Sequence, residues 1–184
     1  ERVFSSWVLS RGGRVHDMQP APRPLALYFP QFHAVPENDR FWGANFTEWT
    51  LLRDLVLSDP PLKKPLSVDE GGLGYYDLQD YTTRQRQAHL ARQYGVTGFC
   101  FYHYWFSGEQ APPNHLVMGK IPEAMLRDGQ PNVPFMLSWA NEPWTKRWTG
   151  EQDTTLLSQT YGNDEAEWIE HYDYLVPFFQ NVNY

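Results

Sequence analysis

Short apolar segments recur along the chain at wide intervals. They are residues 25–29 ("LALYF"), the aromatic run that starts at Val96 and contains "GFCFYHYWF", and residues 133–140 ("VPFMLSWA"). Apolar runs of this length, rich in aromatic or branched residues and bounded by Pro or Gly, are typical of buried strands. The pattern therefore predicts three strands.

Longer segments with helical spacing lie between and after these runs. Residues 80–94 place apolar groups along one helix face, and Gly95 supplies a stop signal. Residues 122–128 predict a short helix with Pro122 at an early position, where its missing N–H does no harm. Residues 163–179 repeat the helical spacing and predict a second long helix.

The order of these elements predicts the fold class. Strand, loop and helix repeat three times, which implies an α/β protein with parallel strands and helical crossovers. The loops after the strands are long, whereas Gly95 alone separates the first helix from the second strand. That asymmetry favours a (β/α) TIM-type barrel, and a doubly wound sheet is the alternative. We expect a tail or linker over residues 1–24, a loop over 30–49, and a loop with at most a short helix over 51–74.

Aromatic and short polar residues gather where each predicted strand stops. In a parallel barrel these ends are neighbours, so we expect one cleft there. Rings that stack on sugar C–H faces, mixed with hydroxyl-binding groups and few Lys residues, favour a neutral saccharide; the alternative is that the rings are core. The residues expected in the cleft are Tyr28, Gln31, His33, His103, Tyr104, Trp105, Trp139, Asn141, Glu142 and Trp144.

Two carboxylates stand among aromatic residues, Glu48 in "FTEW" and Glu142 in "ANEPW". Surroundings that exclude water raise a carboxyl pKa and can produce a general acid. Both residues are therefore candidate catalytic groups. The alternative for each is a structural Glu that orients a Trp N–H or pairs with Arg147.

Charge and composition exclude several function classes. The net charge of −7 and the pI near 5.3 argue against nucleic acid as a partner. No apolar stretch is long enough for a membrane span, and no secretory signal precedes the domain, so we expect a cytoplasmic protein. The six His residues lack metal-ligand spacing, and no nucleotide fingerprint is present, so neither a metal nor another cofactor is expected.

Three long motifs resemble the WbsX-type glycosyltransferase family. They are "LYFPQFHAVPENDRFWGANFTEW", "YGVTGFCFYHYWF" and "PFMLSWANEPWTKRWTG", in the expected order from about Leu25 onwards. That family looks related to the endo-α-mannosidases of glycoside hydrolase family ninety-nine. The resemblance implies a (β/α) barrel, of which residues 25–184 would form the N-terminal portion with three of eight units.

The resemblance also implies a carbohydrate substrate and a role in polysaccharide or glycan biosynthesis. The alternatives are an endo-α-mannosidase-like hydrolase and a non-catalytic sugar-binding module or fragment. Three barrel units would leave open sheet edges, through which the chain could associate with itself. Site residues implied by the matching motifs are Gln31, His33, Glu48, Trp49, His103, Tyr104, Trp105, Asn141, Glu142 and Trp144, and we expect Arg147 to contact the substrate as well.

Overall fold

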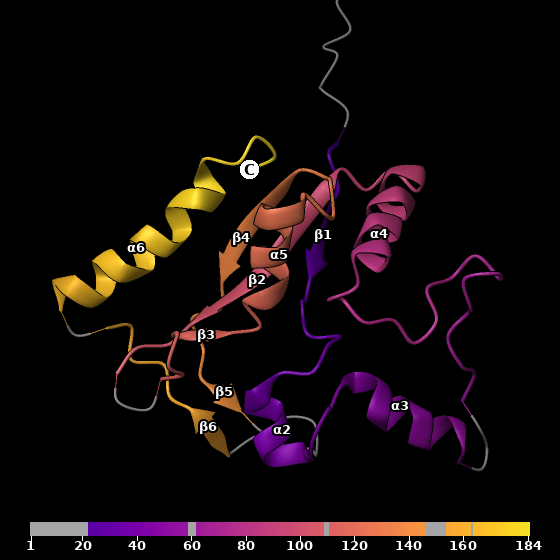
Figure 1. The fold of residues 1–184 in the computed structure, drawn as a ribbon, viewed down its shortest axis with the longest axis horizontal. Helices are drawn as coiled ribbons and strands as arrows, with labels where there is room; N and C mark the ends of the chain where they lie inside the picture. Colours follow the sequence, from indigo (N-terminus) through magenta and orange to yellow (C-terminus); the bar gives the residue numbers. More distant parts are fainter. Residues whose placement is uncertain (1–21, 59–61, 109–110, 146–153, 163) are drawn as a thin grey trace, which may run out of the picture.

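The computed structural model describes residues 22–58, 62–108, 111–145, 154–162 and 164–184 (Figure 1). Its strands are β1 (Leu25–Tyr28), β2 (Gly98–Trp105), β3 (Leu116–Val117), β4 (Phe135–Trp139), β5 (Trp144–Thr145) and β6 (Thr155–Leu157). Its helices are α2 (Pro36–Trp42), α3 (Glu48–Val56), α4 (Tyr81–Gln93), α5 (Lys120–Asp128) and α6 (Glu165–Phe179). Most of the predicted tail lies outside the described residues.

The main sheet is parallel, with β2 in its centre. β1 pairs with one side of β2, so that Leu27 lies opposite Cys100, and β4 pairs with the other side, so that His103 lies opposite Trp139. Successive long strands are thus neighbours in the sheet and are joined by α4 and α5 (Figure 1). The predicted α/β fold with helical crossovers is confirmed.

The core lies between one face of this sheet and the helices. Tyr28, Phe99, Phe101 and Phe135 project from the strands toward buried residues of the helices, which are Ala88 and Ala91 on α4, Ile121 and Met125 on α5, and Phe178 on α6. All three crossover or flanking helices therefore cover the same face. A doubly wound sheet carries helices on both faces, and that arrangement is not seen in the described residues.

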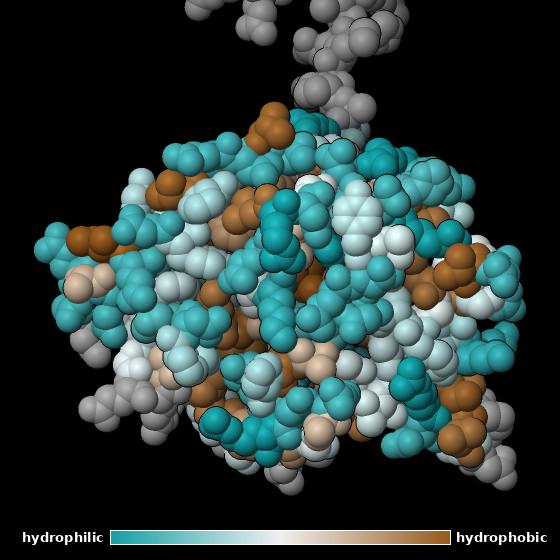
Figure 2. Space-filling view, viewed as in Figure 1, coloured by the Kyte–Doolittle hydropathy of each residue, from teal (hydrophilic) through white to brown (hydrophobic). Residues whose placement is uncertain are grey.

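The opposite face of the sheet has no helical cover from the described residues. On this face Leu27 is 70% exposed and Met136 is 43% exposed. β1 and β4 each have β2 as their hydrogen-bonded neighbour within the part of the chain described, so the sheet is open there and no closed barrel is seen. By contrast, the surface shown in Figure 2 is mostly hydrophilic, with hydrophobic residues in scattered patches.

One close approach explains a glycine at the start of β2. A Cβ atom added to Gly98 would lie 2.2 Å from the carbonyl oxygen of Pro134, which precedes β4. Real side chains do not tolerate that distance, so Gly98 allows β2 and β4 to pair from their first residues.

An ion pair between a buried guanidinium and a partly exposed carboxylate joins the two crossover helices. Both Nη atoms of Arg84 on α4 donate to the carboxylate of Asp128 on α5, at 2.8 and 2.6 Å, and Nη1 also donates to the carbonyl of Gln130 at 2.6 Å. Arg84 is 1% exposed. This bidentate contact holds the pKa of Asp128 below its usual range and sets α4 against α5.

The predicted long elements are confirmed, and the missed ones are short. The ends of all six elements lie within two residues of the predicted ranges; the elements are β1, β2, β4, α4, α5 and α6. The loop predicted over residues 30–49 is wrong in part, because it contains α2 and the start of α3. α2 is seven residues long, which is too short for a clear apolar period. α3 does repeat apolar residues at helical spacing, at Trp49, Leu52 and Val56, and the prediction overlooked this signal. β3, β5 and β6 are two or three residues long and leave no periodic signal.

Candidate functional site

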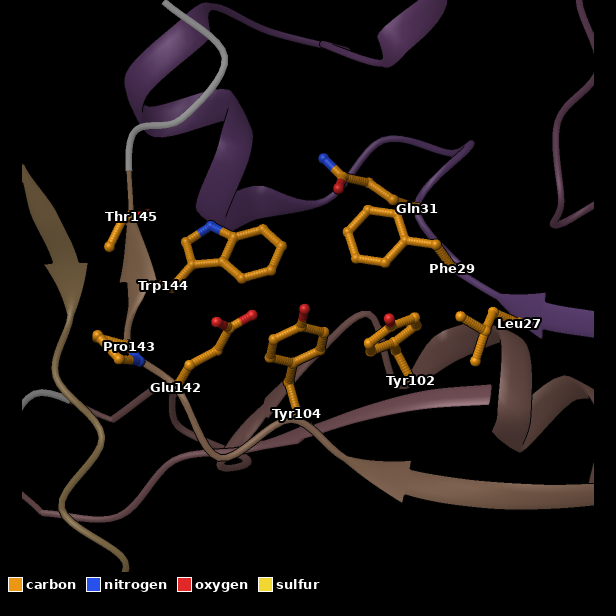
Figure 3. Close-up of a pocket in the computed structure, with 9 residues that line it drawn as sticks. All are labelled: Leu27, Phe29, Gln31, Tyr102, Tyr104, Glu142, Pro143, Trp144 and Thr145. Atoms are coloured by element: carbon orange, nitrogen blue, oxygen red, sulfur yellow. The ribbon is translucent and has the colours of Figure 1, made fainter. Parts of the chain in front are cut away.

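A hollow of about 460 Å³ opens on the face of the sheet that the helices leave uncovered. We call it the inner hollow (Figure 3). Its lining residues come from β1 and the turn after it, from β2, and from the segment that follows β4: Leu27, Phe29, Gln31, Tyr102, Tyr104, Glu142, Pro143, Trp144 and Thr145. These segments are the carboxyl ends of the three parallel strands, where ligands of α/β proteins are expected.

Aromatic rings form most of its wall. The rings of Phe29 and Trp144 are nearly parallel, with an interplanar angle of 14° and centroids 6.5 Å apart. Tyr104 meets the Trp144 ring edge-on at 5.0 Å, and Tyr102 meets Phe29 edge-on at 5.8 Å. Such contacts hold each ring in place. Tyr104 and Trp144 are buried and expose only small parts of their rings to the hollow, whereas Phe29 and Tyr102 are half-buried and expose more.

Polar groups point into the same space. Figure 3 shows the hydroxyls of Tyr102 and Tyr104 and the carboxylate of Glu142 directed toward the rings of Phe29 and Trp144. Glu142 is exposed, so the expected exclusion of water around it is not seen. The hollow thus combines apolar ring surfaces with groups that bind hydroxyls.

Gln31 is the buried polar member of the lining. It is fully buried, and neither its amide oxygen nor its amide nitrogen has a hydrogen-bond partner among the residues that the structure describes. A buried amide without partners is unfavourable, and native proteins retain few of them. Gln31 and Pro30 lie in the turn that follows β1, which ends at Tyr28.

Four of the predicted cleft residues lie on the other side of the sheet. Tyr28, His103, Trp105 and Trp139 face the helices, because side chains alternate along a strand and these residues are out of step with Tyr102 and Tyr104. These four residues were expected in the cleft, but the structure places them on the helix side of the sheet. The hydroxyl of Tyr28 donates to Oε1 of Gln87 on α4 at 2.6 Å, and burial raises its pKa well above the usual range.

Two further predicted residues lie elsewhere, one buried and one with a buried carboxylate. His33 is 1% exposed, and burial lowers its pKa to about 4. Glu48 begins α3 and its buried carboxylate oxygens have no hydrogen-bond partner in the described part of the chain. Burial raises the pKa of Glu48, as expected from its aromatic setting, but Glu48 does not line the inner hollow.

The remaining predicted residues are also outside the hollow. Trp49 donates from Nε1 to the carbonyl of Tyr76 at 2.6 Å and packs on Phe32, which is a structural contact. Asn141 is exposed and its carbonyl accepts from the Tyr161 hydroxyl at 2.7 Å. Arg147 lies outside the described residues.

Sequence reasoning missed part of the lining. The residues it did not name are Leu27, Phe29, Tyr102, Pro143 and Thr145. Strict alternation from Tyr104 would have selected Tyr102 and rejected His103 and Trp105. That signal was present in the sequence, whereas no local signal placed Phe29 against Trp144.

A sequence model of the family described as Glycosyltransferase WbsX matches residues 24–184. The chain belongs to this glycosyltransferase WbsX family. The three motifs that contribute to the inner hollow all lie inside the matched range. Membership supports a carbohydrate-active role for the chain.

Two curated relatives are similar to the chain. Both are described as uncharacterized protein WxcX, from Xanthomonas campestris pv. campestris strains B100 and ATCC 33913, and each is 38% identical over 150 residues. The alignment covers 80% of this chain and 20% of each relative, so the chain spans about a fifth of their length. No solved structure matches the chain.

Within the described ranges, no three His, Cys, Asp or Glu side chains gather closely enough to hold a metal ion. None of the helices seen in that part of the chain has the length and apolar character needed to cross a bilayer.

Proposed function

We propose that this chain forms the saccharide-binding wall of a glycosyltransferase that acts in polysaccharide or glycan biosynthesis. The observation that best supports this is the inner hollow itself. Fixed faces of Phe29 and Trp144 stand beside two tyrosine hydroxyls and the Glu142 carboxylate at the carboxyl ends of parallel strands. A sugar unit presents both kinds of surface, because its C–H faces are apolar and its hydroxyl groups need hydrogen-bond partners.

Each group has a role in this proposal. The rings of Trp144 and Phe29 contact the C–H face of a sugar unit, and the hydroxyls of Tyr102 and Tyr104 bind its hydroxyl groups. The Gln31 amide gains the partners that it lacks among the described residues. The Glu142 carboxylate accepts the proton of an acceptor hydroxyl while that oxygen attacks the anomeric carbon and the donor's leaving group departs.

A second candidate is sugar binding without turnover by this part of the protein. The inner hollow receives one carboxylate, Glu142, from the described residues, and Glu48 lies elsewhere. An endo-α-mannosidase-like hydrolase of the usual kind needs two carboxyl groups about 5–10 Å apart. Hydrolase activity of this kind would therefore require a further carboxylate from another part of the protein.

The architecture proposed for the domain is a (β/α) barrel that residues 25–184 begin. Helices on one face, the open edges of β1 and β4, and the exposed Leu27 and Met136 support it. In isolation the same edges favour self-association of this chain. A cytoplasmic location stays a prediction.

The test compares Glu142→Gln with Asp69→Asn, which removes an exposed carboxylate far along the chain from the hollow. Saccharide binding is followed by tryptophan fluorescence, and product is measured with an activated sugar donor and with water alone. We expect Glu142→Gln to retain binding and to lose about 100-fold or more in transfer rate. Product from water alone would favour the hydrolase. Binding without product in the unmodified protein would favour the second candidate, and absence of both would reject the proposal.

A further inference from the structure

A second aromatic hollow lies on the helix side of the sheet, where β2 and β4 end and α6 begins. Its volume is about 370 Å³, and we call it the outer hollow. Among the described residues, it shares no lining residue with the inner hollow. Its lining residues are Trp105, Ser107, Trp139, Tyr161, Gly162, Glu167, Trp168 and His171.

Several rings of the outer hollow are open to solvent. Trp139 is 41% exposed, Tyr161 is 49% exposed and Trp168 is 57% exposed, whereas Trp105 is 4% exposed and forms the floor. Single exposed rings are common on proteins, but three that line one depression form a contiguous apolar surface. Such a surface has the form of a ligand platform.

The rings are held in place before any ligand binds. Nε1 of Trp168 donates to the carbonyl of Tyr161 at 3.1 Å, and Trp139 stands nearly edge-on to the Tyr161 ring at 6.0 Å. A Cβ atom on Gly162 would lie 3.0 Å from the Trp168 indole, so glycine lets the ring lie against the backbone. Prearranged rings lose little freedom when a ligand binds.

The polar groups of the outer hollow suit a neutral, hydroxylated ligand. Glu167 accepts a hydrogen bond from the Gly108 N–H at 3.3 Å, which fixes its carboxylate at the edge of the hollow. His171 supplies an imidazole whose pKa burial lowers to about 4, so it is neutral near pH 7. No Lys or Arg is among the lining residues that belong to the described ranges, and this composition disfavours phosphates and other anions.

The outer hollow is connected to the proposed reaction site through a short segment. Trp139 lines the outer hollow and Glu142, three residues later, lines the inner one. The Tyr161 hydroxyl donates to the carbonyl of Asn141, the residue before Glu142, at 2.7 Å. Both hollows therefore lie at the same end of the sheet, on opposite sides of the segment after β4.

We infer that the outer hollow is a second saccharide subsite, which binds a remote unit of an oligosaccharide or polysaccharide whose reacting unit occupies the inner hollow. The inference rests on the proposed function for the class of ligand. It adds that the substrate is an oligosaccharide or polysaccharide rather than a single sugar, and that Trp168, Trp139 and Tyr161 contact it.

The test uses the full protein and an array of neutral oligosaccharides from one to eight units, followed by titration of the ones bound. Trp168→Ala removes a ring of the outer hollow, and Trp168→Phe retains a ring without the indole N–H. Tyr172→Ala is the matched control, because Tyr172 is a 60% exposed aromatic residue on α6 outside the hollow. Trp144→Ala reports on the inner hollow.

We expect Trp168→Ala to weaken binding of the longer oligosaccharides by about three- to tenfold and to leave binding of one or two units unchanged. Trp168→Phe should lose less affinity than Trp168→Ala, and Tyr172→Ala should bind with normal affinity. Trp144→Ala should no longer bind the ligands of one or two units. Equal affinity of Trp168→Ala and the unmodified protein at every length would overturn the inference while leaving the proposed function intact. If Trp144→Ala bound saccharide normally while Trp168→Ala lost binding, the assignment of the inner hollow as the saccharide site would be overturned instead. A blank array, or a Trp168→Ala effect on self-association alone, would overturn the saccharide subsite.

Discussion

His103 on β2 and His171 on α6 face each other with their Nε2 atoms 2.8 Å apart. Trp105 stacks on His171 at 4.5 Å, and His115 stacks on Trp105 at 4.9 Å. One imidazole of the pair must have an unprotonated Nε2, which accepts a hydrogen bond from the Nε2–H of the other. This contact docks α6 on the sheet and makes the docking sensitive to acid.

Acid is expected to destabilise the fold through this pair. Burial lowers the pKa of His103 to about 3 and that of His171 to about 4, below the ordinary value of 6.5. The unfolded chain therefore binds more protons, so stability is complete above about pH 6.5 and falls as the pH drops below that value.

Between pH 7.5 and 5.5 the pair should contribute a loss of about 2 kcal/mol in the free energy of unfolding, discounted because His171 is half-exposed. Urea unfolding of His171→Phe, compared with the unmodified protein at both pH values, measures the difference. His89→Phe, at an exposed position on α4, is the control. An unchanged pH dependence in His171→Phe would show that other groups are responsible.

Removal of the buried guanidinium should destabilise the helix layer. Arg84→Ala leaves the Asp128 carboxylate without its bidentate partner, so we expect a loss near the lower end of about 3–5 kcal/mol, because Asp128 is partly exposed. Arg92→Ala is the matched control, since Arg92 lies on the same helix but is exposed and donates to a single carbonyl, that of Asn132. Chemical unfolding of both variants gives the comparison, and equal losses would contradict the role assigned to Arg84.

Gln31→Leu and Gln87→Leu should shift stability in opposite directions. Gln31 has no partner among the described residues, so an apolar side chain should raise the free energy of unfolding by about 1 kcal/mol. Gln87 accepts from Tyr28, so its loss leaves a buried hydroxyl without an acceptor and should lower stability by about 1–3 kcal/mol.

Saccharide titration of the same two variants separates stability from function. Gln31→Leu should weaken binding by about tenfold, the value of one hydrogen bond, whereas Gln87→Leu should bind as the unmodified protein does. A less stable Gln31→Leu variant with normal binding would show that the amide is structural.

Gly98→Ala should strain the pairing of β2 with β4. The added methyl group would meet a backbone oxygen, which cannot move aside as a side chain can. We therefore expect the free energy of unfolding to fall by an amount near the upper end of about 1–3 kcal/mol. Thr97→Ala, one residue earlier and half-buried, is the control. A thermal unfolding midpoint equal to that of the control would contradict the close approach.

The aromatic run of β2 shows how much of the candidate site the sequence pattern could predict. Its richness in rings indicated a ligand wall, and Tyr104 does line the inner hollow. His103 and Trp105 contribute instead to the packing of α6, because neighbours on a strand point to opposite faces. One set of alternate side chains on β2 had to face the helices, and which set it was depended on where α6 docks. Nothing within the run specifies that position.

The sequence by itself determined the alternation of strands and helices, the family, and the strand ends as the place of the candidate site. These follow from local periodicity, stop signals and motifs, which act within a few residues of one another. Only the tertiary structure decided that Phe29 stacks with Trp144, that Glu48 lies apart from Glu142, and that a second aromatic hollow forms against α6. These relationships join segments more than twenty residues apart, where contact depends on how the sheet and helices pack rather than on any local preference.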